Sequence, residues 1–347
     1  MPFQPVMTAA PPGFGPVPAR VLTDIETLPC DLYIWRGPRP VLYAMRGGDL
    51  RRVVARAQRG MSFLVRDIDA DLLHGALAES LPRVLANQRI SPIERSKTAY
   101  SIAAKVLAPI FMRDRPLDHD GLILTQNAID SITMRMLADE DLVWAMVATM
   151  QKHQATHTHA INSAVYGIVL ARFAHIGGPD EIRDVARGGL LHDIGKNRVP
   201  KGILDKPGPL DALEWQVMRG HARAGNDMIV RALGFVPSYA HIIAEHHERC
   251  DGSGYPSSRL EDQIAIDTQV VAIVDAFDAL TSRRPYKSAV STFDALRLMR
   301  VAMRGQFNDE LLREFIRLLG GWNALSGGNV TGEVANSDLV GALKVAG

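Results

Sequence analysis

Histidine is concentrated in one stretch of this sequence. Nine of the eleven histidines fall within residues 153–247, where a uniform spread along the chain would place about three. Imidazole is a ligand for iron, manganese, zinc and copper, and carboxylates in the same set favour hard or borderline ions over a thiolate-type site. The clustering therefore indicates a metal centre, although any one histidine on a helix face is more often structural.

Three motifs within and beyond this stretch sharpen the hypothesis. LLHDIGK at 190–196 places His192 beside Asp193 at the end of an apolar helical run. HHERCDGSGYP at 246–256 pairs His246 with His247; a helix cap followed by a turn explains its glycines but not the adjacent imidazoles. Asp275 lies in an apolar helical pattern at 269–287, where a carboxylate is costly unless it is paired, hydrogen-bonded or bound to metal.

Composition sets wider bounds. A chain of 347 residues with 47% hydrophobic and 22% charged residues is typical of a folded, soluble protein of two domains. The net charge of +1 gives no whole-chain signal for binding DNA, RNA or an anionic membrane. Cys30 and Cys250 are too far apart and too few for a disulfide scaffold, and the longest charge-free apolar run, at 142–150, is about half a membrane span. We expect a cytoplasmic protein without a membrane partner.

The elements that must position these residues follow from periodicity. Residues 1–20 are rich in proline and glycine and predict a flexible arm without a signal-peptide pattern. Residues 31–66 predict strand, turn, strand, helix and strand, and two helices up to residue 112 complete a small α/β domain at 21–118. The helical pattern at 119–320 predicts an all-helical domain, and 321–347 predicts a flexible tail. The fold class is therefore mainly α.

The motifs together, in this order, resemble the HD-GYP family, a bacterial subgroup of the HD phosphohydrolases that is similar to cyclic di-GMP phosphodiesterases. The resemblance covers residues 150–318, about half of the chain. It is carried by THTHAINSAV at 156–165, LLHDIGK, the segment VPKGILDKPGPLDALEWQVMRGH at 199–221, HHERCDGSGYP and VDAFDALTSRRPYK at 274–287.

The resemblance implies an HD-type helical domain that holds two divalent metals, iron or manganese, with Asp193 bridging them. The implied ligands are His159, His192, Asp193, His221, His246, His247 and Asp275. Some relatives hold a third metal through a glutamate four residues before the first ligand histidine, but Ala155 stands there, so two metals are expected. The remaining histidines of the cluster are expected to be structural or solvent-exposed: His153, His157, His175 and His241.

The implied activity is hydrolysis of cyclic di-GMP to pGpG, with further hydrolysis to GMP left open. Two cations lower the pKa of a bridging water, orient the resulting hydroxide and draw charge from the phosphoryl oxygens. Asp193 and Lys196 are the catalytic candidates, and Lys196 is placed to neutralise the phosphate. The implied substrate-binding residues are Gly254, Tyr255 and Pro256 as a lip beside the metals, Asp278 at a guanine edge, and Arg284 and Lys287 at the phosphates.

Two alternatives stay open. The same chemistry could act on cyclic GMP-AMP, which ligand identities cannot distinguish from cyclic di-GMP. A degenerate domain that binds the dinucleotide or a partner protein without turnover usually lacks ligand residues, and this sequence retains all of them. The N-terminal domain shows neither a phosphoreceiver pattern nor a phosphate-binding loop, so a regulatory role, a homodimer contact and a docking site for a protein partner are all open.

Overall fold

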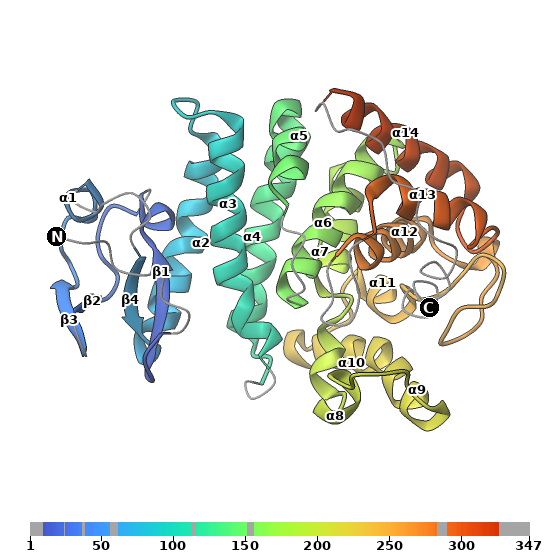
Figure 1. Ribbon diagram of the computed structural model, residues 1–347, viewed down its shortest axis with the longest axis horizontal. Coiled ribbons are helices and arrows are strands. Elements are labelled where there is room, and N and C mark those ends of the chain that lie inside the picture. The colour runs from blue at the N-terminus through green and yellow to red at the C-terminus, as the bar shows by residue number, and fades with distance from the viewer. Residues whose placement is uncertain are drawn as a thin grey trace. The chain divides into compact units, whose positions relative to one another are not determined.

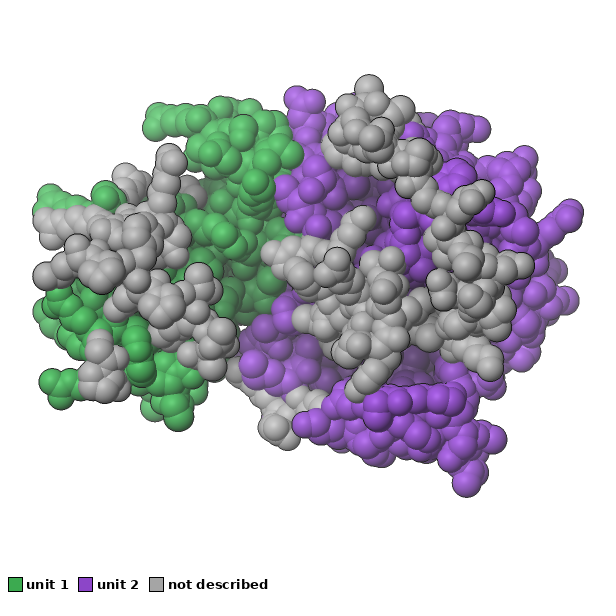
Figure 2. All heavy atoms as spheres, viewed as in Figure 1, with its two compact units in different colours: residues 1–106 green, residues 107–347 purple. Residues whose placement is uncertain are grey.

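The computed structural model describes residues 10–23, 25–36, 39–55, 62–112, 116–150, 156–282 and 290–325. The chain forms two compact units, Met1–Val106 and Leu107–Gly347, which are coloured separately in Figure 2. No helix in the described part of the chain is both long enough and apolar enough to cross a membrane.

The first unit contains a four-stranded antiparallel sheet with the order β1-β4-β2-β3 (Figure 1). Its strands are β1 (Phe14–Pro18), β2 (Leu32–Arg36), β3 (Arg39–Ala44) and β4 (Ser62–Arg66). The short helix α1 (Leu50–Ala55) lies between β3 and β4 in the chain, so the predicted succession of elements over 31–66 is confirmed.

Strand β1 contradicts the flexible arm predicted for residues 1–20. Phe14 pairs with Arg66 and Pro18 with Ser62, so this segment forms an edge of the sheet. Proline is tolerated at an edge because the missing N–H can point away from the neighbouring strand. The Pro16 carbonyl accepts a hydrogen bond from Nζ of Lys105 at 2.6 Å. Residues 1–9 lie outside the described residues.

Two long helices, α2 (Ala70–Ala86) and α3 (Pro92–Leu107), follow the sheet. In α2, Leu73, Leu77, Leu81 and Leu85 recur every four residues and are buried, as a helix with one apolar face requires. Burying four leucines contributes on the order of 6–12 kcal/mol before the entropic cost of folding is counted. The small α/β unit predicted from the sequence is confirmed.

Within the described residues of the second unit, the named secondary-structure elements are all helices, as predicted. Its helices are α4 (His119–Ala138), α5 (Glu140–Thr149), α6 (Thr156–Phe173), α7 (Pro179–Leu191), α8 (Lys201–Leu204), α9 (Ala212–Arg219), α10 (His221–Leu233), α11 (Ala240–Glu245), α12 (Ile266–Thr281), α13 (Thr292–Val301) and α14 (Asp309–Leu325). Helix α6 contacts α4, α7 and α12, and these helices run side by side in Figure 1. The apolar residues of α12 that were predicted to be buried are buried in the structure: Val270, Val271, Ile273, Val274, Phe277 and Leu280.

The borders of the second unit differ from those predicted. The unit begins at Leu107 rather than near residue 119. The short helix Ala108–Phe111 packs on α4 and α6, and the Ile110 carbonyl accepts a hydrogen bond from Asn197 at 2.9 Å. At the other end, α14 continues to Leu325, so the first residues of the predicted tail at 321–347 are helical. Residues 326–347 lie outside the described residues.

Candidate metal centre

The seven ligands that the sequence implied come from five separate parts of the second unit. His159 lies in the first turns of α6, and His192 directly follows α7 with Asp193 next to it. His221 begins α10, His246 and His247 follow α11, and Asp275 lies inside α12. Gly195 allows the segment after Asp193 to touch α10, because a Cβ at this position would lie 1.9 Å from the His221 carbonyl oxygen.

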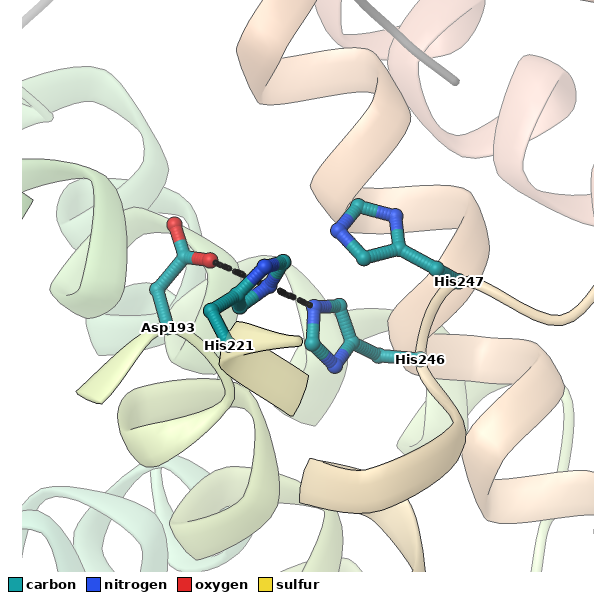
Figure 3. A group of neighbouring side chains, drawn as sticks. All are labelled: Asp193, His221, His246 and His247. Carbon is teal, nitrogen blue, oxygen red and sulfur yellow. Dashed lines mark hydrogen bonds and ion pairs between the residues drawn. The ribbon is translucent and has the colours of Figure 1, made fainter. Parts of the chain in front are cut away.

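The structure brings all seven side chains together in two groups. Asp193, His221, His246 and His247 form one group (Figure 3), and His159, His192 and Asp275 form the other. Within each group the potential ligand atoms all lie within 4.8 Å of one another. Ligand atoms about 2.0–2.2 Å from one ion lie at most about 4.4 Å apart, so each group needs only a small contraction to hold a divalent cation.

Asp193 lies between the two groups. Its Oδ1 atom faces Nε2 of His221 at 3.3 Å and Nε2 of His246 at 4.0 Å. Its Oδ2 atom faces Nε2 of His192 at 3.4 Å and Nε2 of His159 at 3.8 Å. One oxygen is therefore directed at each group, which is the arrangement that a carboxylate bridging two cations requires. The ammonium of Lys196 lies 2.6 Å from Oδ2.

Three of the imidazoles are oriented by backbone carbonyls. Nδ1 of His192 bonds Gly189 O at 2.8 Å, Nδ1 of His221 bonds Met218 O at 2.7 Å, and Nδ1 of His246 bonds Ile243 O at 2.9 Å. A carbonyl oxygen only accepts, so in each ring Nδ1 carries the proton and donates. In the neutral ring Nε2 then presents a bare lone pair to the centre, as a metal-binding histidine must.

His159 is oriented by a carboxylate instead. Its Nδ1 donates to Oδ2 of Asp278 at 2.7 Å, and its Nε2 faces Asp275 Oδ1 at 3.1 Å. Burial would lower the pKa of His159, but hydrogen bonds to Asp275 and Asp278 outweigh it and raise that pKa to about 10. A proton on Nε2 of His159 therefore interacts with the negative charge of Asp275. A bound cation would displace this proton and interact with the same carboxylate.

Asp278, which was predicted to contact a guanine edge, has hydrogen-bond partners within the protein. The side chain is buried, its Oδ2 accepts from His159, and its Oδ1 accepts from Asn162 Nδ2 at 2.9 Å. Ser282 Oγ also donates to Oδ2 at 3.2 Å. Both oxygens therefore accept hydrogen bonds within the protein, and Asp278 orients His159, a predicted metal ligand. The sequence did not indicate these contacts, because helical spacing gives a residue's face but not its partner.

The chemistry of these residues fits two divalent cations. Asp193 Oδ1 and His247 Nδ1 are buried and take part in no hydrogen bond among the described residues, so no hydrogen bond competes with a ligand at either atom. Burial would raise the pKa of Asp193, but the Lys196 ammonium and neighbouring histidines hold it well below its usual value. Burial lowers the pKa of His246 and His247, which keeps both rings neutral. A deprotonated carboxylate and neutral imidazoles are the forms that bind metal.

Comparison with known proteins agrees with this geometry. A family model described as an HD domain matches residues 139–311. The chain is 28% identical over 291 residues to the cyclic di-GMP phosphodiesterase PA4108 of Pseudomonas aeruginosa, covering 79% of this chain and 70% of that protein. The chain belongs to the HD-GYP family.

Two further relatives define the extent of this HD-GYP similarity. The chain is 40% identical over 148 residues to 3'3'-cGAMP-specific phosphodiesterase 3 of Vibrio cholerae, covering 43% of this chain and 32% of that protein. Its fold is similar to that of Bd1817, an HDG"Y"P protein from Bdellovibrio bacteriovorus, with a TM-score of 0.65. That match covers 89% of this chain and 100% of the solved chain at 15% identity, so it concerns the fold alone.

The GYP loop of this HD-GYP chain packs directly against the ligand histidines. A Cβ on Gly254 would lie 2.4–2.5 Å from backbone atoms of residues 247–249, so only glycine fits there. The Tyr255 N–H donates to the His247 carbonyl at 3.2 Å, and the Tyr255 ring stacks on the His247 ring with centroids 4.6 Å apart. The Tyr255–Pro256 peptide is cis. The predicted lip therefore lies beside the metal-binding groups, with Tyr255 buried against a ligand instead of open to solvent.

The histidines assigned structural or exposed roles lie outside the two groups where the structure describes them. His157 is half-buried, and His175 is exposed at the end of α6. His241 is partly buried and pairs with Asp267 at 2.9 Å. The remaining predicted positions lie outside the described residues: His153, Ala155, Arg284 and Lys287.

Sequence reasoning missed three supporting residues. Asn162 holds Asp278, and it lies three residues after His159 in the opening motif, where helical spacing could have indicated it. Glu248 is buried and accepts from the N–H groups of Ser257 at 2.6 Å and Arg259 at 2.9 Å, which fixes the GYP loop. Arg219 stacks on Tyr255, a contact that no sequence pattern indicated.

Proposed function

We propose that this chain hydrolyses a phosphodiester bond of a cyclic dinucleotide, with cyclic di-GMP as the first candidate and pGpG as its product, and with further hydrolysis to GMP left open. The observation that carries the proposal is the position of Asp193, which directs one oxygen at each of two buried ligand groups. Paired cations a few ångströms apart are typical of enzymes that hydrolyse phosphate esters. The curated relatives are named as cyclic dinucleotide phosphodiesterases, which supports the same class of substrate.

The residues of the chain have distinct roles in this proposal. Two divalent cations, when bound, supply Lewis acidity and a nucleophile at neutral pH. The backbone carbonyls behind His192, His221 and His246 fix their rings, so no reorganisation is needed when substrate binds. Lys196 is paired with Asp193 and is 27% exposed, so its ammonium can both hold this carboxylate ionised and neutralise a phosphate oxygen.

The test is anaerobic purification with metal analysis, followed by hydrolysis assays on cyclic di-GMP. We expect two metal ions for each chain and turnover to pGpG. The His192→Ala and Asp193→Ala variants should lose metal and activity together, because these residues serve the two groups and the bridge. Protein that holds two metals yet hydrolyses no cyclic dinucleotide would refute the enzyme and favour a non-hydrolysing sensor.

Cyclic GMP-AMP is a second candidate substrate, and one specific observation favours it. Over the matched region, the chain is 40% identical to a phosphodiesterase named as specific for 3'3'-cGAMP, against 28% over a longer match to PA4108. PA4108 is named for cyclic di-GMP and the Vibrio protein for 3'3'-cGAMP. The two relatives therefore support the same reaction on dinucleotides that differ in one nucleobase. Competition between the two dinucleotides in one assay measures the ratio of their kcat/KM values and assigns the preferred substrate.

Further parts of the proposal concern residues and properties beyond the described site. We propose iron or manganese as the metals, because histidines combined with carboxylate oxygens suit both ions. Arg284 and Lys287 remain the proposed phosphate ligands, and Gly254, Tyr255 and Pro256 the proposed substrate-binding lip beside the metals. We propose a cytoplasmic location and, for the N-terminal unit, either a homodimer contact or a docking surface for a protein partner. The mass of the full chain in solution distinguishes these last two roles.

A further inference from the structure

Arg219 is connected to the metal-binding groups through a stack of aromatic rings. It is the last residue of α9 and stands two residues before His221 in the chain. Its guanidinium carbon lies 5.3 Å from the centre of the Tyr255 ring and 5.9 Å from the centre of the Trp215 ring. The Tyr255 ring in turn stacks on His247, with an angle of 27° between the ring planes. One ring therefore separates an exposed cation from a proposed metal ligand.

The charge of Arg219 is available to a ligand. Stacking uses the flat face of a guanidinium and leaves its N–H donors, which point outward in the plane, free to bind. Within the described part of the chain, no carboxylate pairs with Arg219 and no acceptor bonds its N–H groups, whereas Lys196 is already paired with Asp193. Two aromatic rings thus hold the side chain of an exposed arginine without neutralising it.

We infer that Arg219 binds the second phosphate of the substrate, the one that is not hydrolysed. This inference rests on the proposed function, because a cyclic dinucleotide carries two phosphodiesters of one negative charge each. The two ligand groups and Lys196 serve the phosphate that reacts, and Arg219 offers the other phosphate a cation in addition to those proposed at Arg284 and Lys287. A planar fork of donors matches the two free oxygens of a phosphodiester. Arg219 is accordingly a residue that distinguishes cyclic dinucleotides from simpler phosphodiesters.

A structural explanation for Arg219 is a cation that stabilises the C-terminal end of α9 through the helix dipole. A lysine serves the dipole equally well, but it neither stacks as a plane nor binds phosphate through two parallel hydrogen bonds. Replacing Arg219 by lysine and by glutamine therefore separates the two explanations.

The experiment compares the metal-loaded full-length wild type with Arg219→Gln and Arg219→Lys on two substrates. One is the preferred cyclic dinucleotide, and the other is bis(p-nitrophenyl) phosphate, which has a single phosphodiester. We expect R219Q to raise the KM for the cyclic dinucleotide by about ten-fold with little change in kcat, as the loss of a charge-assisted hydrogen bond predicts. R219K should recover only part of this loss, and the KM for the small substrate should not follow it.

Arg231→Gln is the matched control, because Arg231 is an exposed arginine at the far end of α10. Metal content and melting temperature, measured on every variant, show whether the centre is intact. An R219Q variant with an unchanged KM, or with equal losses on both substrates, would overturn the inference while the proposed function stands. A wild type that hydrolyses no cyclic dinucleotide would overturn both.

Discussion

The hydrogen bond between Asp278 and His159 provides a test of how the centre is held. Oδ2 of Asp278 accepts from Nδ1 of His159 at 2.7 Å, and Asp278 is buried. Asp278→Asn removes the negative charge but keeps an oxygen of the same size in the same place. Outer-shell substitutions of this kind weaken metal binding by about 10- to 100-fold, which is about 1.4–2.8 kcal/mol. We expect D278N to lose that much affinity at the group that contains His159.

The assay is competition for manganese(II) against a chelating dye, with bound metal counted by elemental analysis. Asp267→Asn is the matched control, because Asp267 also lies on α12 and also bonds a histidine, His241, outside both ligand groups. This control should bind metal like the wild type. If D278N keeps wild-type metal affinity and only its KM for the dinucleotide rises, then Asp278 contacts substrate, and its role as the positioning residue for His159 is refuted.

Three more predictions follow from the geometry. Gly254→Ala should lower stability by about 2 kcal/mol or more in thermal unfolding, because its Cβ would overlap backbone atoms, whereas Gly202→Ala, with open space around it, should not. Metal affinity should rise by up to about ten-fold for each pH unit between pH 6 and 8. The reason is that His159, with a pKa of about 10, carries a proton in this range that the metal must displace. Metal affinity that is independent of pH in chelator competition would contradict this. The hydrogen bond to Asp267 raises the pKa of His241 above 6.5, so the pair stabilises the fold fully below pH 6.5 and loses this effect as pH rises further. The difference in melting temperature between wild type and His241→Gln should therefore be largest near pH 5.5, and the effect should stay below about 1 kcal/mol because the side chain is 36% exposed.

The residues that come together in the two groups could be predicted from sequence because their types are chemically distinctive. Adjacent histidines and a carboxylate within an apolar helix have few structural explanations, and the family motifs supplied their order. The apolar residues of α12 that were predicted to be buried are buried, and the helix is buried on nearly every side, so Asp275 and Asp278 are buried with them. Both signals are local, so a single sequence contains them.

The features that the sequence did not reveal depend on partners far along the chain. Asp278 and His159 are 119 residues apart, and nothing near either one indicates that they bond. Strand β1 was missed because Pro16 and Pro18 argue against a strand, and only the edge position of β1 makes them acceptable. The border between the units was misplaced because Ile110 is held by Asn197, a contact that requires the folded second unit.

The predicted ligand histidines are oriented partly by local contacts and partly by a contact that is distant in the sequence. His192, His221 and His246 each bond the carbonyl of the residue three positions earlier, at a helix C-terminal end where backbone carbonyls lack helical partners. Their orientation is therefore set within a few residues of chain. His159 lies instead in the first turns of α6, where the spare backbone groups are N–H donors and cannot accept from an imidazole N–H. Its acceptor must come from another helix, and a carboxylate on α12 also supplies negative charge that favours a cation at Nε2. The last turn of the preceding helix thus orients His192, His221 and His246 without tertiary support, whereas His159 is oriented by Asp278.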